Sequence, residues 1–201
     1  MKSLTPVTLE GHGVRLEPLH IDHETVLRAA VADGRLWELW FASVPAPDEL
    51  ARYIEDALAS QRAGRALPFL VCDAQGTAVG CTRLHDCERH IDRVHIGYTW
   101  YSASRQRTHV NTACKLLLLT HAFETLSAQV VVLRTDRFNL ASQRAIAALG
   151  AKLDGVLRHH QARRDGTVRD SVIFSILRDD WTDVRRHLLT RLARHDNPAS
   201  T

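Results

Sequence analysis

The chain has 201 residues, 45% of them hydrophobic and 24% charged, which excludes a disordered or fibrous protein and favours one compact domain. Its formal net charge of +3 at pH 7 is too small to indicate nucleic-acid binding by itself, although it suits a partner that carries phosphates. No apolar stretch after Met1 resembles a signal peptide, and no window approaches the roughly 18 apolar residues of a membrane span, so we expect a cytoplasmic protein.

The first half of the chain predicts helices that alternate with strands. Apolar and polar residues alternate in residues 14–18, which is typical of a strand. Asp22 is an N-cap type of residue for a helix through residue 32, and apolar residues recur on one helical face in residues 48–62. Further strands are predicted over residues 69–73, 78–84 and 94–101.

The second half continues this alternation. Residues 111–126 predict a strongly apolar helix, whose leucines from Leu116 to Leu119 imply burial on more than one face. Asn139 and Gly150 bound a shorter helix as N-cap and C-terminal stop. The remaining elements are strands over residues 129–135, 152–160 and 168–177, the last two joined by a hairpin turn, and a helix over residues 181–194 with an apolar stripe and a basic face.

Several separated segments resemble the RimJ/RimL-like branch of the GNAT acetyltransferases. Residues 95–101 and 106–112 are similar to that branch's passage from strand 4 to helix 3. Residues 139–151 are similar to its strand 5 and helix 4 segment, and residues 154–158 and 169–172 complete the resemblance. Separate motifs rarely occur in the right order by chance, so we expect this fold.

The resemblance implies an α/β (α+β) GNAT fold. Its mixed, largely antiparallel sheet of about seven strands would be splayed between strands 4 and 5, with helices on both faces. We expect a single domain over residues 1–201, with a core over about residues 14–181 and a C-terminal helix after it. By analogy with the family, the chain would be an N-acetyltransferase with acetyl-CoA as its co-substrate.

The turn before helix 3 would hold the pyrophosphate of CoA on backbone N–H groups, because the first turn of a helix has unpaired donors and a partial positive charge. The family has glycine or alanine at two positions of this turn, and His109 and Asn111 stand there instead. Either Arg105, Arg107 and His109 add contacts to CoA phosphates, or the turn has lost its ligand and the chain is a non-catalytic acyl-CoA-binding module. Asn111 would also serve as the N-cap of the helix.

The resemblance implies a cofactor site that extends from strand 4 to helix 4. Backbone N–H groups of strand 4 would polarise the thioester carbonyl if that strand bulges as it does in the family. The expected cofactor-binding residues are Tyr98, Thr99, Trp100, Gln106, Arg107, Thr108, His109, Val110, Asn111, Thr112, Asn139 and Ser142.

Two residues are candidates for proton transfer. Ser142 occupies the position from which the family protonates the leaving thiolate; alternatively, it is an ordinary first-turn residue of a helix that Asn139 caps. His95 lies where the family often has a glutamate that acts as the general base. An imidazole with a pKa of about 6.5 can likewise accept a proton at neutral pH. A single histidine on a strand can equally be structural.

The acceptor would be a primary amine, either a protein N-terminus or a small amine. Trp37, Trp40 and Phe41 lie between the first two helices, where they would line the acceptor pocket or fill the core. The cysteines form no CxxC pair and the histidines lack zinc spacing, so we expect no metal. The basic face of the last helix is interpreted as solvated, so we expect no nucleic-acid or membrane partner and a monomer or homodimer.

Overall fold

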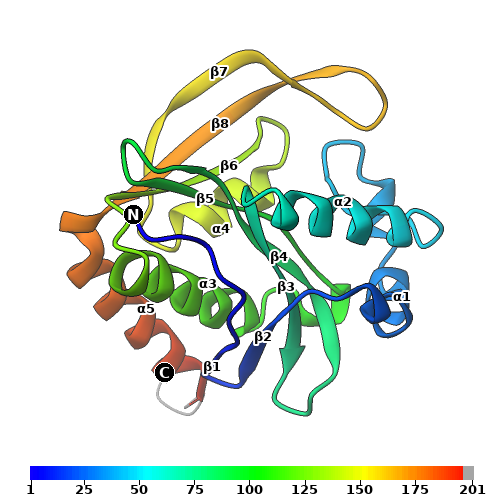
Figure 1. Ribbon diagram of the computed structural model, residues 1–201, viewed down its shortest axis with the longest axis horizontal. Helices are drawn as coiled ribbons and strands as arrows, with labels where there is room; N and C mark the ends of the chain where they lie inside the picture. Colours follow the sequence, from blue (N-terminus) through cyan, green and yellow to red (C-terminus); the bar gives the residue numbers. More distant parts are fainter. Residues whose placement is uncertain (197–201) are drawn as a thin grey trace.

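The computed structural model describes residues 1–196, which fold around one eight-stranded sheet (Figure 1). The sheet order is β1-β2-β3-β4-β5-β6-β8-β7, and every neighbouring pair is antiparallel except β5 and β6. This confirms the mixed, largely antiparallel sheet. The strands are β1 Leu9–Gly11, β2 Val14–Pro18, β3 Ala66–Asp73, β4 Ala78–Glu88, β5 Arg93–Tyr101, β6 Val130–Asp136, β7 Lys152–Ala162 and β8 Val168–Leu177.

The eighth strand is β1, which the expected count of about seven omitted. It turns back onto β2 through His12 and Gly13, whose φ angles are +54° and +73°. Positive φ at both central residues is the geometry of a tight two-residue hairpin turn. The strand numbers of the family therefore shift by one here, and its strands 4 and 5 correspond to β5 and β6.

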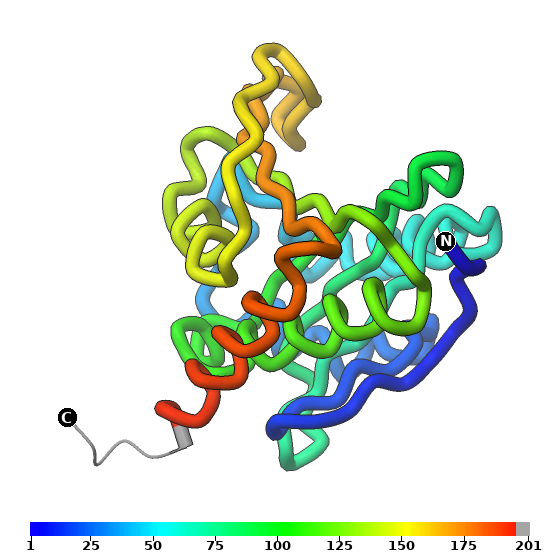
Figure 2. The backbone as a smooth tube through the Cα atoms, turned by 90° about the vertical axis from the view of Figure 1, so that its left-hand side faces the viewer, coloured from blue at the N-terminus to red at the C-terminus, as the bar shows by residue number. Residues whose placement is uncertain are grey.

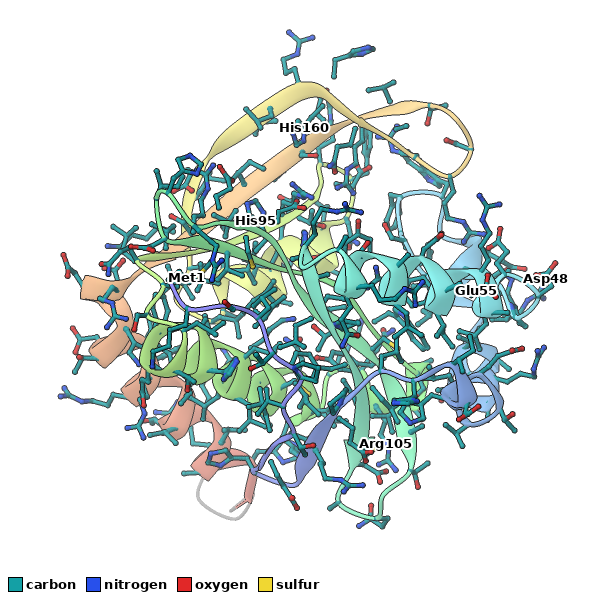
Figure 3. The ribbon with its side chains drawn as sticks, viewed as in Figure 1. Met1, Asp48, Glu55, His95, Arg105 and His160 are labelled. Atoms are coloured by element: carbon teal, nitrogen blue, oxygen red, sulfur yellow. The ribbon has the colours of Figure 1, made fainter. Side chains whose placement is uncertain are left out.

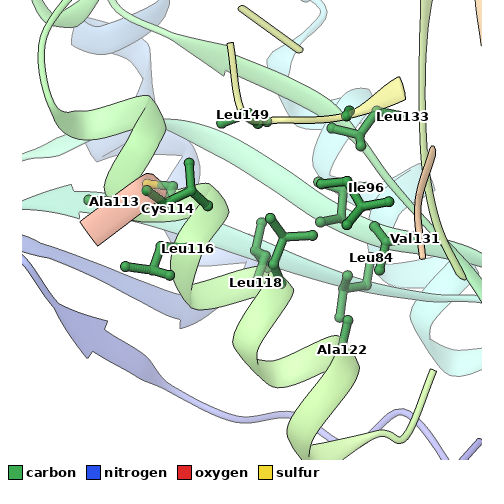
Figure 4. Close-up of a cluster of buried hydrophobic side chains, with 14 of the residues drawn as sticks. Leu84, Ile96, Ala113, Cys114, Leu116, Leu118, Ala122, Val131, Leu133 and Leu149 are labelled. Carbon is green, nitrogen blue, oxygen red and sulfur yellow. The ribbon is translucent and has the colours of Figure 1, made fainter. Parts of the chain in front are cut away.

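Helices cover both faces of the sheet, as expected (Figure 2). The helices α1 Glu24–Ala32 and α2 Leu50–Arg62 pack with Leu70, Cys81 and Trp100 in one core. The helices α3 Val110–Thr120, α4 Leu140–Ala147 and α5 Trp181–Asp196 contribute to a larger core on the other face (Figure 4). None of these helices, within the described part of the chain, is long and apolar enough to cross a membrane.

Helix α3 differs from its prediction at both ends. It begins at Val110 with His109 as N-cap, so the prediction that Asn111 caps the helix is wrong. Thr108 Oγ1 accepts the Val110 N–H at 3.3 Å and supplies the cap instead. At the other end, α3 continues as one π-helical turn, His121–Thr125. Leu118 and Leu119 are fully buried, which confirms that the helix is buried on more than one face.

Strands β5 and β6 pair over only part of their length. The parallel register runs from Arg93↔Val130 to Ile96↔Leu133 and stops there. On its other side, β5 pairs with β4 at Gly97 and again at Trp100 with a register shift between them, and Tyr98 within that shift has φ +50°. A shift of this kind is a β-bulge, which bends the strand and increases its twist. Strand β5 therefore carries its bulge where it separates from β6.

Candidate active site

The backbone after β5 leaves a row of N–H groups without acceptors. Ser104 N donates to Asp33 Oδ2 at 3.1 Å, and Gln106 N donates to Ala103 O, which closes the short helical turn there. The N–H groups of residues 107–109, 111 and 112 find no acceptor within residues 1–196. Because they lie at the N-terminus of α3, where the helix dipole favours negative charge, this turn can bind an anion.

The two residues at the expected glycine positions have backbone conformations that do not require glycine. His109 has φ −65°, and Asn111 lies within α3. The His109 ring points toward the β1–β2 turn, since its Nε2 lies 3.2 Å from where a Cβ on Gly13 would stand, and its centroid is 5.0 Å from that of His195. Between residues 106 and 112, positive φ occurs at Arg107 alone, at +60°.

The two arginines of the turn have different surroundings. Arg105 Nη2 pairs at 2.6 Å with the buried carboxylate of Asp73, so this arginine is held at the end of β3. Figure 3 places Arg105 at the opposite end of β5 from His95. Arg107 is exposed and has no ion-pair partner among residues 1–196. Arg107 is therefore the arginine of this turn that is available to a phosphate.

A buried lysine lies beside the β5 bulge. Lys115 of α3 is 5% exposed, and its Nζ donates to Thr99 Oγ1 at 2.6 Å. Thr99 Oγ1 is also 2.8 Å from Thr82 Oγ1, so a polar chain links α3, β5 and β4. Burial lowers the pKa of Lys115 to about 8, and no carboxylate pairs with it in the described chain. Sequence reasoning missed this residue because the helical pattern around it is apolar.

A cavity of about 420 Å³ opens where β5 and β6 separate. Its lining includes Gly97 and Tyr98 of β5, Arg134 of β6, and the aromatic side chains of Trp40 and Phe41. A neighbouring cavity of about 680 Å³ is lined by Trp37, Trp40 and Tyr98. Two of the expected acceptor residues thus line the first cavity, and the third lines the second.

His85 of β4 lies in the first cavity against Gly97. A Cβ on Gly97 would stand 2.4 Å from His85 Nε2, so only glycine leaves room for the ring. On the other side of the ring, Nδ1 is 3.2 Å from Asp86 Oδ2, which favours the tautomer with its proton on Nδ1. Burial lowers the pKa of His85. The ring is therefore neutral at pH 7, with Nε2 free to accept a proton.

His95 lies opposite His85 across the β4–β5 register, with its ring centroid 5.5 Å from that of His85. It does not line the 420 Å³ cavity, and its Nδ1 is buried without a partner. Burial lowers the pKa of His95 to about 4. The ligand atoms of His85, Asp86 and His95 lie within 4.8 Å of one another, but Arg134 already pairs with Asp86 at 2.8 Å, so a metal there would meet a competing cation.

The remaining expected site residues lie outside the linings of the two cavities. Asn139 Oδ1 accepts the Ser142 N–H at 3.0 Å and caps α4. Ser142 is partly exposed, and neither residue lines the two cavities. Trp100 and Val110 are buried in the core, so only their backbone is available to a ligand.

The cysteines are unsuited to nucleophilic catalysis. All are unpaired, and burial raises their pKa values: to about 11 for Cys72 and Cys87, and to about 12 for Cys81 and Cys114. A thiol with such a pKa is almost entirely protonated at pH 7, and the thiolate is the reactive form.

Comparisons with known proteins identify the family and the fold. The acetyltransferase (GNAT) domain family matches residues 14–152. A structure assigned as an acetyltransferase from T. thermophilus is 30% identical with a TM-score of 0.83, over 94% of this chain and 98% of that chain. Mycobacterium smegmatis RimJ with CoA-disulfide is 22% identical with a TM-score of 0.80, over 96% and 98%. RimL, the ribosomal L7/L12 alpha-N-protein acetyltransferase with coenzyme A, is 16% identical with a TM-score of 0.72, over 85% and 98%. No curated protein matches the sequence.

Proposed function

Because the chain belongs to the GNAT family of acetyltransferases, we propose that it moves the acetyl group of acetyl-CoA directly to a primary amine, either a protein N-terminus or a small amine. One observation carries the proposal. The separation of β5 from β6, the bulge at Tyr98 and a cavity of about 420 Å³ coincide at one place in the sheet. We further propose that the whole chain is one domain; its residues 197–201 lie outside the described structure.

Acetyl-CoA would bind along the edge of β5 that β6 leaves unpaired. The N–H groups of residues 107–109, 111 and 112 and the exposed Arg107 would bind its phosphates. The pantetheine would follow Tyr98, Thr99 and Trp100 toward the cavity. When bound, acetyl-CoA supplies an acetyl group that is already activated as a thioester.

His85 would act as the general base, in place of the expected His95. His85 lines the cavity with its Nε2 against Gly97, Asp86 Oδ2 lies 3.2 Å from its Nδ1, and its ring is neutral at pH 7. It would take the proton that the amine nitrogen loses as it forms the new bond. His95 has a pKa of about 4 and does not line the cavity. We propose that it packs beside the His85 ring and helps to position it.

Ser142 remains the proposed proton donor for the leaving thiolate. It lies in the first turn of α4, directly after β6, and its hydroxyl has no hydrogen bond within residues 1–196. A hydroxyl without a fixed partner can rotate toward a developing thiolate. Since the cysteine thiols are protonated, the transfer would be direct, with no acyl-cysteine intermediate.

The alternative is a non-catalytic acyl-CoA-binding module. It depends on the missing glycines, yet His109 and Asn111 have helical backbones, and the His109 ring lies near Gly13 and His195. That substitution therefore gives no reason for lost binding or lost turnover.

Isothermal titration with acetyl-CoA, followed by assay of CoA release over a panel of amines, tests the proposal. We expect saturable binding and release that depends on an amine. Ser142→Ala should lower turnover more than it lowers acetyl-CoA affinity. Binding without turnover on every amine would favour the module, and no binding would reject both functions.

A further inference from the structure

The 420 Å³ cavity is lined by basic side chains and by no carboxylate. Arginines enter it from β6, from the β7–β8 hairpin and from β8, and His85 lies beside them. No aspartate or glutamate is among the lining residues of the described chain. The aromatic wall of Trp40, Phe41 and Tyr98 adds apolar surface but no negative charge. A concave site lined by one sign of charge concentrates ligands of the opposite sign.

Three of the lining arginines are already neutralised by partners outside the cavity. Such pairs contribute little net field, so they do not by themselves predict an anionic ligand. The pairs are Arg134 with Asp86 at 2.8 Å, Arg163 with Asp136 at 2.7 Å, and Arg164 with Glu49.

Arg169 is the lining arginine without a carboxylate partner among residues 1–196. Its Nη2 donates to Gln161 Oε1 at 2.6 Å, while its Nε is buried and makes no hydrogen bond. Burial lowers the pKa of Arg169, the nearby charge of Asp136 raises it in part, and the neighbouring Arg134 and Arg163 lower it again. The buried Nε is closed to a ligand, but a half-buried guanidinium without a carboxylate partner is costly, and an anion on its cavity side would relieve that cost.

A second cation without a carboxylate partner among residues 1–196 lies near the cavity but does not line it. Arg83 of β4 is 5% exposed, and its Nε is buried without a partner. Its guanidinium lies 4.6 Å from the Tyr53 ring centroid and 4.1 Å from that of Tyr98. These cation–π contacts hold the charge in place but do not neutralise it. The Tyr98 ring separates Arg83 from the cavity, so the positive potential of Arg83 adds to that of Arg169.

We propose that the acceptor is a primary amine that also carries a carboxylate, and that Arg169 binds this carboxylate. The inference rests on the proposed function and narrows its substrate class. Polycationic amines such as polyamines would be repelled by the same charges. The unpaired cations would also lower the pKa of the bound amine, which favours the neutral form that reacts. The carboxylate could belong to an acidic residue of a peptide N-terminus or to a free amino acid.

Matched acceptors separate these possibilities. CoA release would be measured with the peptides Ala-Glu-Glu and Ala-Gln-Gln, amidated at their C-termini, with free glutamate, and with spermidine. We expect kcat/KM for the Glu peptide to exceed that for the Gln peptide by about tenfold or more, and the ratio to fall as KCl rises. Preference for free glutamate over the Glu peptide would identify the small-molecule source. Equal rates for both peptides without a preference for free glutamate, or preference for spermidine, would overturn the proposal.

Substitutions test whether Arg169 carries the preference. Arg169→Gln should bring the Glu/Gln rate ratio close to one, and Arg169→Lys should retain part of it, because the charge remains but the fork geometry is lost. Arg62→Gln, on the exposed end of α2, is the matched control and should leave the ratio unchanged. The ratio is insensitive to a uniform loss of folded protein. An unchanged ratio in Arg169→Gln would overturn the assignment.

Binding keeps the inference separate from the proposed function. Both peptides would be titrated into the full chain in the presence of CoA, which has no acetyl group to transfer. Tighter binding of the Glu peptide, together with no CoA release when acetyl-CoA replaces CoA, would uphold the anionic site and reject the acetyltransferase proposal. Turnover of both peptides with equal affinity would uphold the acetyltransferase and reject the anionic site.

Discussion

At the scale of single residues, the position of the His85 ring depends on the missing side chain of Gly97. A methyl group on Gly97 would stand 2.4 Å from His85 Nε2, so the glycine is required for the imidazole to lie across β5. Asp86 Oδ2 lies 3.2 Å from the other ring nitrogen. The glycine therefore gives the ring its place, and the nearby carboxylate favours a proton on Nδ1, which leaves Nε2 to accept one.

His85→Gln should lower kcat about a hundredfold or more, because general base catalysis contributes at least that factor. Burial lowers the pKa of His85 from 6.5, so the acidic limb of the native kcat/KM profile should have its midpoint below 6.5. The variant should lose this limb.

The control is His95→Gln, measured over the same pH range. His95 does not line the cavity, so this variant should keep the limb. A native-like profile in His85→Gln, or its loss in His95→Gln, would return the base to His95.

Arg107 has a left-handed backbone conformation, which is unfavourable for a residue with a side chain. Its φ of +60° is strained for a residue with a Cβ. Arg107→Gly should therefore raise the free energy of unfolding by up to about 1 kcal/mol in urea denaturation. The same change removes an exposed cation at the open turn, so acetyl-CoA affinity should fall roughly two- to fivefold in calorimetry. Unchanged affinity would mean that the backbone N–H groups alone bind the phosphates.

At the scale of elements, α3 combines an apolar core helix with one buried ammonium. Lys115 makes a hydrogen bond to Thr99 at the β5 bulge, and burial lowers its pKa from 10.5 to about 8. Its protonated form is therefore destabilising, fully so below pH 8. This cost disappears as the pH rises toward 10.5, where the unfolded chain also loses the proton.

Lys115→Met should accordingly raise the free energy of unfolding at pH 7, by roughly 3 kcal/mol. The gain should shrink between pH 8 and 10.5. Denaturant unfolding at a series of pH values measures it, with Lys152→Met as the control on an exposed lysine that pairs with Asp180. A gain that did not depend on pH would show that the pKa of Lys115 is not lowered in the folded protein.

The order of the elements could be predicted because each leaves a local pattern. The capping of α4 by Asn139 depends on residues a few positions apart. The bulge at Tyr98 and the role of His85 could not be predicted in this way. They depend on the register of β4 against β5, which brings His85 opposite His95 and its ring over Gly97. The resemblance to the family suggested His95 instead.

At the scale of the whole molecule, the fold divides the proposed reaction between two sides of the sheet. The open turn before α3 lies on the side of the larger core, and the arginine-lined cavity lies beneath the β7–β8 hairpin, which Figure 2 shows projecting beyond the rest of the chain. The separation of β5 from β6 joins the two sides. The cofactor and the acceptor can therefore enter from different directions and meet at Tyr98.

The central claim is direct transfer to an amine at this meeting point. The most direct measurement incubates the full chain with carbon-13-labelled acetyl-CoA and the Ala-Glu-Glu peptide, then locates the label by tandem mass spectrometry. The account predicts label on the α-amino nitrogen of the peptide, one CoA released per acetyl group, and none on the enzyme's cysteines. Label on a cysteine during turnover, or release of CoA with free acetate and an unmodified peptide, would contradict it.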